Sequence, residues 1–157
     1  MDMHLQQRVA DFYARHSEVL SDDKLEQWPD FYAQDCLYKL TSRVNFDRQL
    51  PLGTILCESR GALIDRVTAI RNTMVFAPRC VLHTVSNARV VEIAADGTLV
   101  TRSMFCVWQT LMNGESHMQM VGRSFDRIKP KGFGLEFRER IAIFDTELVP
   151  GSIVYPI

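Results

Sequence analysis

The chain has 157 residues, 46% of them hydrophobic and 24% charged, which suffices for one core but not for two ordinary domains, so we predict a single domain over residues 1–157. Its 18 basic and 19 acidic residues nearly cancel and leave no electrostatic footprint for nucleic acid or an anionic membrane surface. No apolar run approaches the ~20 residues of a membrane span, and residues 1–4 do not resemble a signal peptide, so we expect a cytoplasmic protein.

The first part of the chain has the pattern of two helices. Apolar residues recur at helical spacing over residues 5–19, which predicts an amphipathic helix that ends near Ser21. Asp22 or Asp23 is suited to cap a second, shorter helix, with Pro29 in its first turns. The apolar face of this second helix consists of Leu25, Trp28, Phe31 and Tyr32.

A change of period marks the first strand. Polar and apolar residues alternate over residues 38–46, which predicts a strand, and residues 54–59 ("TILCES") predict a second, short one. After Gly61, the apolar stripe Leu63, Val67, Ile70 and Met74 predicts a third helix.

The second half of the chain has the pattern of a β-meander. Four long β segments, 80–93, 98–111, 116–128 and 135–148, are separated by the turn signals "AADG", "MNGE" and "PKGFG". Strands of this length must twist and curl, and curling creates a concave face. The sequence therefore predicts an α+β fold, a half-open cone in which three helices of the first half cover a curved mixed or antiparallel sheet.

A metal site is not indicated. Cys36, Cys57, Cys80 and Cys106 are widely spaced in apolar surroundings, which predicts buried thiols without disulfides. Cys80 and His83 have the C-x2-H spacing of half a Rieske cluster site, but the other half, C-x-H, is absent. On a strand these two side chains also point to opposite faces.

Acid–base catalysis is a second hypothesis. A curled sheet capped by helices can bring His83 close to a helix-end carboxylate, Asp30 or Asp35. Ketosteroid isomerase, a cone of this general kind, tunes a pocket carboxylate in this way. A lone histidine is nevertheless more often a core or interface residue, and the aromatic cluster at Trp28 more often packs in a core than binds a ligand. In that case Asp30 is solvated or pairs with an arginine, for which the candidates are Arg66, Arg71, Arg138 and Arg140.

The sequence ends on an apolar segment, "ELVPGSIVYPI". An exposed, disordered end is seldom so apolar. This segment is therefore expected to dock on its own sheet, to insert into a neighbouring subunit, or to do both.

Three stretches together resemble the small, β subunit of aromatic-ring-hydroxylating dioxygenases. They are "WPDFYAQDCLYKL" (28–40), "NFDRQLPLGTILCESRGALIDRV" (45–67) and "SIVYPI" (152–157). The resemblance runs from about residue 10 to the end of the sequence. It is closest to the salicylate 5-hydroxylase and terephthalate or benzoate dioxygenase branch.

The resemblance implies a cone-shaped fold like those of nuclear transport factor 2 and scytalone dehydratase. It also implies a structural role in an α3β3 oxygenase component that hydroxylates a benzoate- or salicylate-like acid. In such enzymes the large α subunit holds the [2Fe-2S] Rieske cluster and the mononuclear Fe(II), and a ferredoxin or reductase supplies electrons from NADH. The β subunit holds no cofactor and forms a homotrimer.

No catalytic residue carries over from the family. The resemblance places "WPDF" and "DRV" at structural and contact positions, and the candidate interface residues are Trp28, Asp30, Asp65, Arg66, Arg71, Tyr155 and Ile157. Two other hypotheses stay open. One is a stand-alone dehydratase or isomerase of the scytalone dehydratase or ketosteroid isomerase type that uses His83 and Asp30, and the other is a ligand-binding homodimer.

Overall fold

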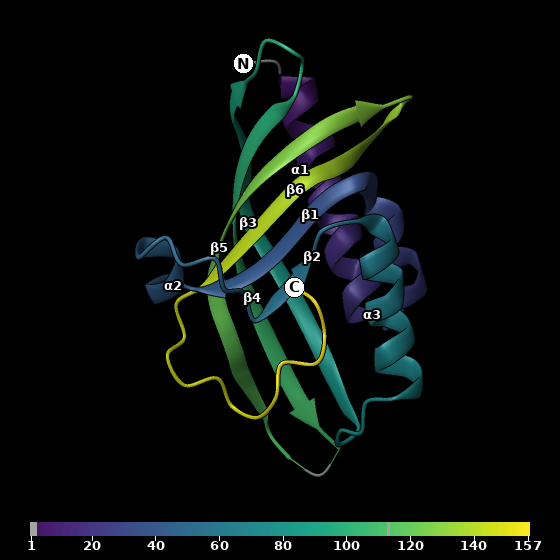
Figure 1. The fold of residues 1–157 in the computed structure, drawn as a ribbon, viewed down its shortest axis with the longest axis vertical. Coiled ribbons are helices and arrows are strands. Elements are labelled where there is room, and N and C mark those ends of the chain that lie inside the picture. Colours follow the sequence, from purple (N-terminus) through teal and green to yellow (C-terminus); the bar gives the residue numbers. More distant parts are fainter. Residues whose placement is uncertain (1–2, 113) are drawn as a thin grey trace.

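The computed structural model describes residues 3–112 and 114–157 (Figure 1). Helix α1 (Met3–Ser21) is an amphipathic helix in the predicted place. Its buried face includes Val9, Phe12, Tyr13 and His16. Within the described residues, none of the helices combines the length and the hydropathy that crossing a bilayer requires.

The segment after α1 differs from the prediction. Leu25–Phe31 forms a short 3-10 helix, η1, and the following strand, β1 (Tyr32–Ser42), begins six residues before the predicted start. The Tyr32 backbone is already extended, and its N–H donates to the Pro29 carbonyl oxygen at the end of η1. Tyr32 therefore belongs to the sheet, and Asp35 lies on a strand instead of at a helix end.

The first predicted strand also ends too late. Arg43–Asp47 forms a short helix, α2, because the Ser42 side chain caps it by accepting a hydrogen bond from the Asn45 N–H at 3.2 Å. Val44 and Phe46, which were predicted on the strand, lie on this helix and are exposed.

The remaining elements follow the predicted order. They are β2 (Ile55–Cys57), α3 (Arg60–Asn72), β3 (Arg79–Ile93), β4 (Leu99–Leu111), β5 (Ser116–Lys131) and β6 (Gly134–Phe144). Helix α3 is capped by Ser59 and ends before Met74. Strand β6 ends at Phe144 and not at residue 148, so residues 145–157 form an irregular segment, which we call the C-terminal strap.

The strands form one curved, mixed sheet of order β2-β1-β6-β5-β4-β3. β1 pairs with β6 in parallel, and all other neighbours are antiparallel. Helix α1 packs on β3, α3 packs on β1 and β2, and η1 lies between these helices. Figure 1 shows α1 and α3 together beside the sheet, and the strap (yellow) looping across the lower part of the strands. The predicted α+β cone is confirmed.

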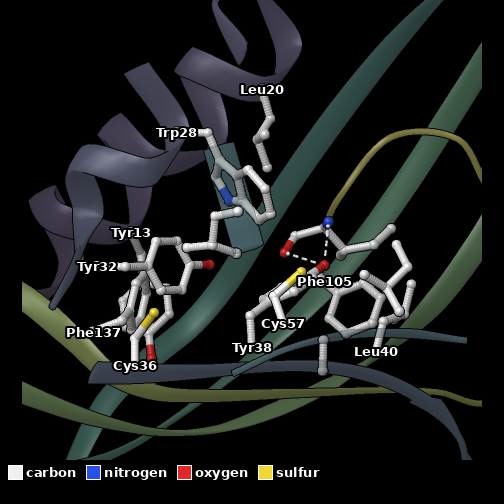
Figure 2. Close-up of a cluster of buried hydrophobic side chains, with 14 of the residues drawn as sticks. Tyr13, Leu20, Trp28, Tyr32, Cys36, Tyr38, Leu40, Cys57, Phe105 and Phe137 are labelled. Atoms are coloured by element: carbon white, nitrogen blue, oxygen red, sulfur yellow. Dashed lines mark hydrogen bonds between the residues drawn. The ribbon is translucent and has the colours of Figure 1, made fainter. Parts of the chain in front are cut away.

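The core is aromatic where the helices meet β1 and β6. The Trp28 and Tyr38 rings contact edge to face, with centroids 5.2 Å apart, and Phe12 packs on Phe137 at 4.7 Å. Trp28 and Tyr32 are fully buried. The prediction that the aromatic cluster belongs to the core is therefore confirmed, and Figure 2 shows it between the helices and the sheet.

Side chains of α1 protect the edge strand β3. The His83 N–H donates to Ser21 Oγ at 2.9 Å, and the Val90 N–H donates to Gln6 Oε1 at 3.1 Å. The Gln6 amide in turn donates to the Ala88 carbonyl oxygen at 2.5 Å. Because these backbone groups are paired, this stretch of β3 is blocked from pairing with a strand of another molecule.

The four cysteines are free, but only two are buried. Cys36 and Cys57 lie in the core, whereas Cys80 is exposed and Cys106 is half-buried. The prediction of four buried thiols is therefore wrong for Cys80 and Cys106, because both occupy outward-facing positions of their strands.

Candidate functional site

A polar cluster lies inside the cone, where α1 faces β5 and β6. The Tyr13 hydroxyl donates to Oδ2 of Asp126 at 2.5 Å, and Nη1 of Arg140 donates to the same oxygen at 3.0 Å. Each of these three side chains has only 1% of its surface exposed. The charges are therefore shielded from water and interact strongly.

Hydroxyl groups from the neighbouring strands complete the cluster. Ser124 Oγ donates to Oδ2 of Asp126 at 2.6 Å, and the Thr101 and Tyr13 hydroxyl oxygens are 2.8 Å apart. Thr101 and Asp126 are directly opposed on β4 and β5 and both point into the cone. The sheet register thus places these groups around one carboxylate oxygen.

The electrostatics favour a structural ion pair over an acid–base dyad. Burial raises the pKa of the Asp126 carboxyl, while the Arg140 guanidinium and the hydrogen bonds from Ser124 and Tyr13 oppose this shift. Burial, followed by the Asp126 carboxylate, raises the pKa of Tyr13 well above its ordinary value. Tyr13 therefore remains a hydrogen-bond donor at neutral pH, and the cluster ties α1 to β5 and β6.

The C-terminal strap reaches this cluster and fills the cone. The Ile157 N–H donates to the Tyr38 hydroxyl at 2.8 Å, and Nε of Arg140 donates to the Ile157 carbonyl oxygen at 3.2 Å. His83 Nε2 donates to the Pro156 carbonyl oxygen at 3.0 Å. Figure 2 shows the Tyr38 hydrogen bonds at the end of the strap as dashed lines. Docking on its own sheet, one of the two predictions for this segment, is confirmed.

Two further side chains hold the strap by its backbone. Arg66 Nη2 donates to the Val154 carbonyl oxygen at 2.9 Å, and Gln119 Nε2 donates to the Ser152 carbonyl oxygen at 3.2 Å. The side chains of Val154 and Ile157 are buried. The strap is therefore an integral part of the core.

His83 and Asp30, the predicted acid–base pair, have separate partners. His83 is 7% exposed, and burial lowers its pKa to about 4, so its ring is neutral at physiological pH. Asp30 is exposed and pairs with Arg60, which was not among the arginines predicted for it. Asp35 is also exposed and pairs with Arg138. The imidazole therefore lies in the core, while both carboxylates face solvent.

The predicted interface residues are divided between the core and the surface. Trp28 and Ile157 are buried in their own chain, and Tyr155 is half-buried, with its ring 5.9 Å from that of Phe76. Their burial gives them a packing role within the chain.

The charged members of that set also have different surroundings. Arg66 binds the strap, and Arg71 pairs with Asp23 and Glu26. Asp65 is exposed on α3. Asp30, Asp65 and Arg71 therefore have the exposure of ordinary surface residues, whereas Arg66 is half-buried.

Within residues 3–112 and 114–157, no group of three or more His, Cys, Asp or Glu side chains is arranged to hold a metal ion. Cys80 is exposed and His83 is buried, as expected for alternating positions on β3. These two residues therefore do not form half of a cluster site.

Asp126 and Tyr13 were missed by the sequence analysis, and Arg140 was noted only as a possible partner for Asp30. A signal for them exists in the strands. In "SFDRI", Asp126 has the same alternation as the inward-facing Ser124 and Ile128. A carboxylate at an inward position requires a buried cation, and Arg140 is the directly opposed residue on β6.

Comparison with known proteins identifies the family of this chain. Residues 15–151 match the family model described as "Ring hydroxylating beta subunit". The chain is 32% identical over 143 residues to the anthranilate 1,2-dioxygenase small subunit of Burkholderia cepacia, covering 91% of this chain and 88% of that one. It is 26% identical over 151 residues to the subunit beta 2 of the terminal oxygenase component of terephthalate 1,2-dioxygenase from Comamonas sp, covering 96% and 97%.

Solved structures give the same result. A protein from Novosphingobium aromaticivorans, described as the β subunit of an aromatic-ring-hydroxylating dioxygenase, superposes with a TM-score of 0.89 at 31% identity over 99% of this chain and 98% of that one. A protein described as a scytalone dehydratase from the same organism has a TM-score of 0.71 at 13% identity over 95% and 89%, which shows a shared fold. The chain belongs to the family of ring-hydroxylating β subunits, the small subunits of aromatic-ring-hydroxylating dioxygenases.

Proposed function

We propose that this chain is a non-catalytic scaffold of a cytoplasmic oxygenase component. Three copies form a trimer that positions three large subunits in an α3β3 particle. The large subunits hold the Rieske cluster and the mononuclear iron, and a ferredoxin or reductase delivers electrons from NADH. The anthranilate and terephthalate named for the relatives are aromatic carboxylates, which supports a benzoate- or salicylate-like substrate.

The filled cone carries this proposal. A stand-alone dehydratase or isomerase needs an interior pocket with a substrate-accessible acid–base pair. Here the Tyr38 hydroxyl, the His83 imidazole and the Arg140 guanidinium bind the backbone of the chain's own strap. Pro156 and Ile157 are buried among these three side chains, which supports a scaffold.

Coexpression with the large subunit tests the proposal. The purified chain alone should convert none of anthranilate, benzoate, salicylate or terephthalate. The copurified complex should hydroxylate at least one of them with consumption of NADH and O2 when the electron-transfer proteins are added. Product is measured by chromatography and iron by elemental analysis.

A histidine variant separates the scaffold from an enzyme. His83→Gln should leave turnover per assembled complex unchanged, because the His83 ring binds the strap and no substrate in this proposal. The matched control is His117→Gln, a half-buried histidine on β5. Turnover or stoichiometric iron binding by the isolated chain would overturn the scaffold proposal.

A further inference from the structure

The outer face of the sheet, opposite α1 and α3, contains a cationic hollow. It has a volume of about 550 Å³ and lies on β3, β4 and β5. Its lining includes Arg89, Arg102, Arg123, Met104 and Phe125. The Arg102 guanidinium lies over the Phe125 ring, 5.0 Å from its centre, which holds the charge against the sheet.

The charges of this hollow are poorly compensated. Arg89 and Arg102 are directly opposed on β3 and β4, and like charges in that position destabilise a sheet. Neither arginine forms an ion pair with any residue that the structure describes, and Arg123 shares Asp145 with Arg43. An anionic partner from outside the chain would relieve this repulsion.

An exposed apolar row extends the hollow along the same face. Leu82, Trp108 and Met118 are in register across β3, β4 and β5 and are 55%, 40% and 45% exposed. Met104, 48% exposed, lies on β4 between Trp108 and Arg102 and joins the row to the hollow. Arginine, tryptophan and methionine are the residue types that protein interfaces favour. This combination, which we call the cationic face, points to a protein partner.

The other edge of the sheet has the complementary chemistry. The edge strand β2 exposes Leu56, and the adjoining helix α3 exposes Ile64. Glu58, two residues after Leu56, and Asp65, next to Ile64, are exposed and form no ion pair within the described part of the chain. We call these four residues the acidic edge. It combines apolar surface with two unpaired carboxylates, while Lys39, opposed to Leu56, donates to the Leu50 carbonyl oxygen.

We propose that the cationic face of one copy of this chain binds the acidic edge of the next copy. The cationic face lies on β3 to β5 and the acidic edge at β2, at opposite ends of the strand order, so the two surfaces do not meet within one chain. A contact between two different surfaces repeats around an axis and closes into a ring when the rotation allows. The inference rests on the proposed function, in which copies form a trimer, and it assigns the surfaces that meet.

Charge reversal with rescue tests this pairing by sedimentation of the purified chain. Arg102→Glu/Arg123→Glu and Glu58→Arg/Asp65→Arg should each weaken self-association about a hundredfold, because each places like charges across the contact. Combining all four substitutions in one chain exchanges the two charges and should restore association to within about tenfold of wild type. High salt should weaken the wild-type assembly.

The matched control is Arg48→Glu, an exposed arginine beyond the end of α2 that belongs to neither surface, and it should leave association unchanged. Circular dichroism confirms that each variant is folded. A monomeric wild-type chain would overturn the inference. A combined variant that is folded but does not associate would also overturn the inference. That result is expected if two cationic faces contact each other around a two-fold axis. Binding of the large subunit, measured by copurification, tests the proposed function separately.

Discussion

Gly122 shows how closely the sheet is packed at the scale of one residue. A Cβ at this position would lie 2.0 Å from the Ile143 carbonyl oxygen and 2.7 Å from the Phe105 ring. Because the nearest atom is backbone, the strand itself must move, and we expect Gly122→Ala to lower the free energy of unfolding by about 1–3 kcal/mol or more. Urea denaturation measures the change.

Gly61→Ala is the control for that variant. Its Cβ would meet only Ser59 Oγ at 3.6 Å, and Gly61 lies in α3, where alanine is favoured. Equal effects of the two substitutions would contradict the steric explanation.

His83 makes stability depend on pH. Its pKa falls from 6.5 in the unfolded chain to about 4 in the folded protein, chiefly through burial. The neutral ring therefore makes its full contribution to the free energy of unfolding above pH 6.5. This contribution, about 3 kcal/mol, is lost as the pH falls through 4. Burial also lowers the pKa of His16, so protonation of His16 at low pH lowers the free energy of unfolding further.

His83→Gln should therefore flatten the dependence of unfolding free energy on pH between 6.5 and 4, as measured by urea denaturation at several pH values. His117→Gln, at a half-buried position, is the control. An unchanged slope in His83→Gln would show that this ring does not titrate as described.

At the scale of elements, the Asp126–Arg140 pair joins β5 and β6 to α1 through Tyr13. Asp126→Asn leaves the buried guanidinium without its counter-charge and should cost about 3–5 kcal/mol of stability. Asp126→Asn/Arg140→Met should cost less than the sum of the two single variants, because the uncompensated charge is gone. Thermal and urea unfolding measure both.

Asp11→Asn provides the comparison, because the Asp11–Arg15 pair is exposed and such pairs contribute less than about 1 kcal/mol. A small effect of Asp126→Asn, equal to that of Asp11→Asn, would mean that the cluster does not tie the elements together.

The helices and strands were largely predictable from the sequence, because the spacing of hydrophobic residues indicates which face of a segment is buried. Helix α1 and the four long strands follow from it. The limits of β1 did not, because the turn at Pro29 and the capping by Ser42 are single hydrogen bonds that do not change the period. The buried ion pair was missed because its two members lie on different strands, 14 residues apart, and meet only through the β5–β6 register.

At the scale of the whole molecule, the cone and the family were predictable and the state of its interior was not. The apolar end of the sequence was compatible with two positions. The position on its own sheet is fixed by hydrogen bonds from Tyr38, His83 and Arg140, which come from three separate strands. Only the folded arrangement brings those donors and acceptors to one place.

The parallel pairing of β1 with β6 has a consequence for biosynthesis. Residues 37–42 of β1 pair with residues 139–144 of β6, and the short strand β2 pairs with only part of β1, so a nascent chain on the ribosome presents β1 without its main neighbour until β6 has been translated. Contacts so distant along the chain make folding slow. Newly made subunits are thus expected to need chaperone protection before they can mature.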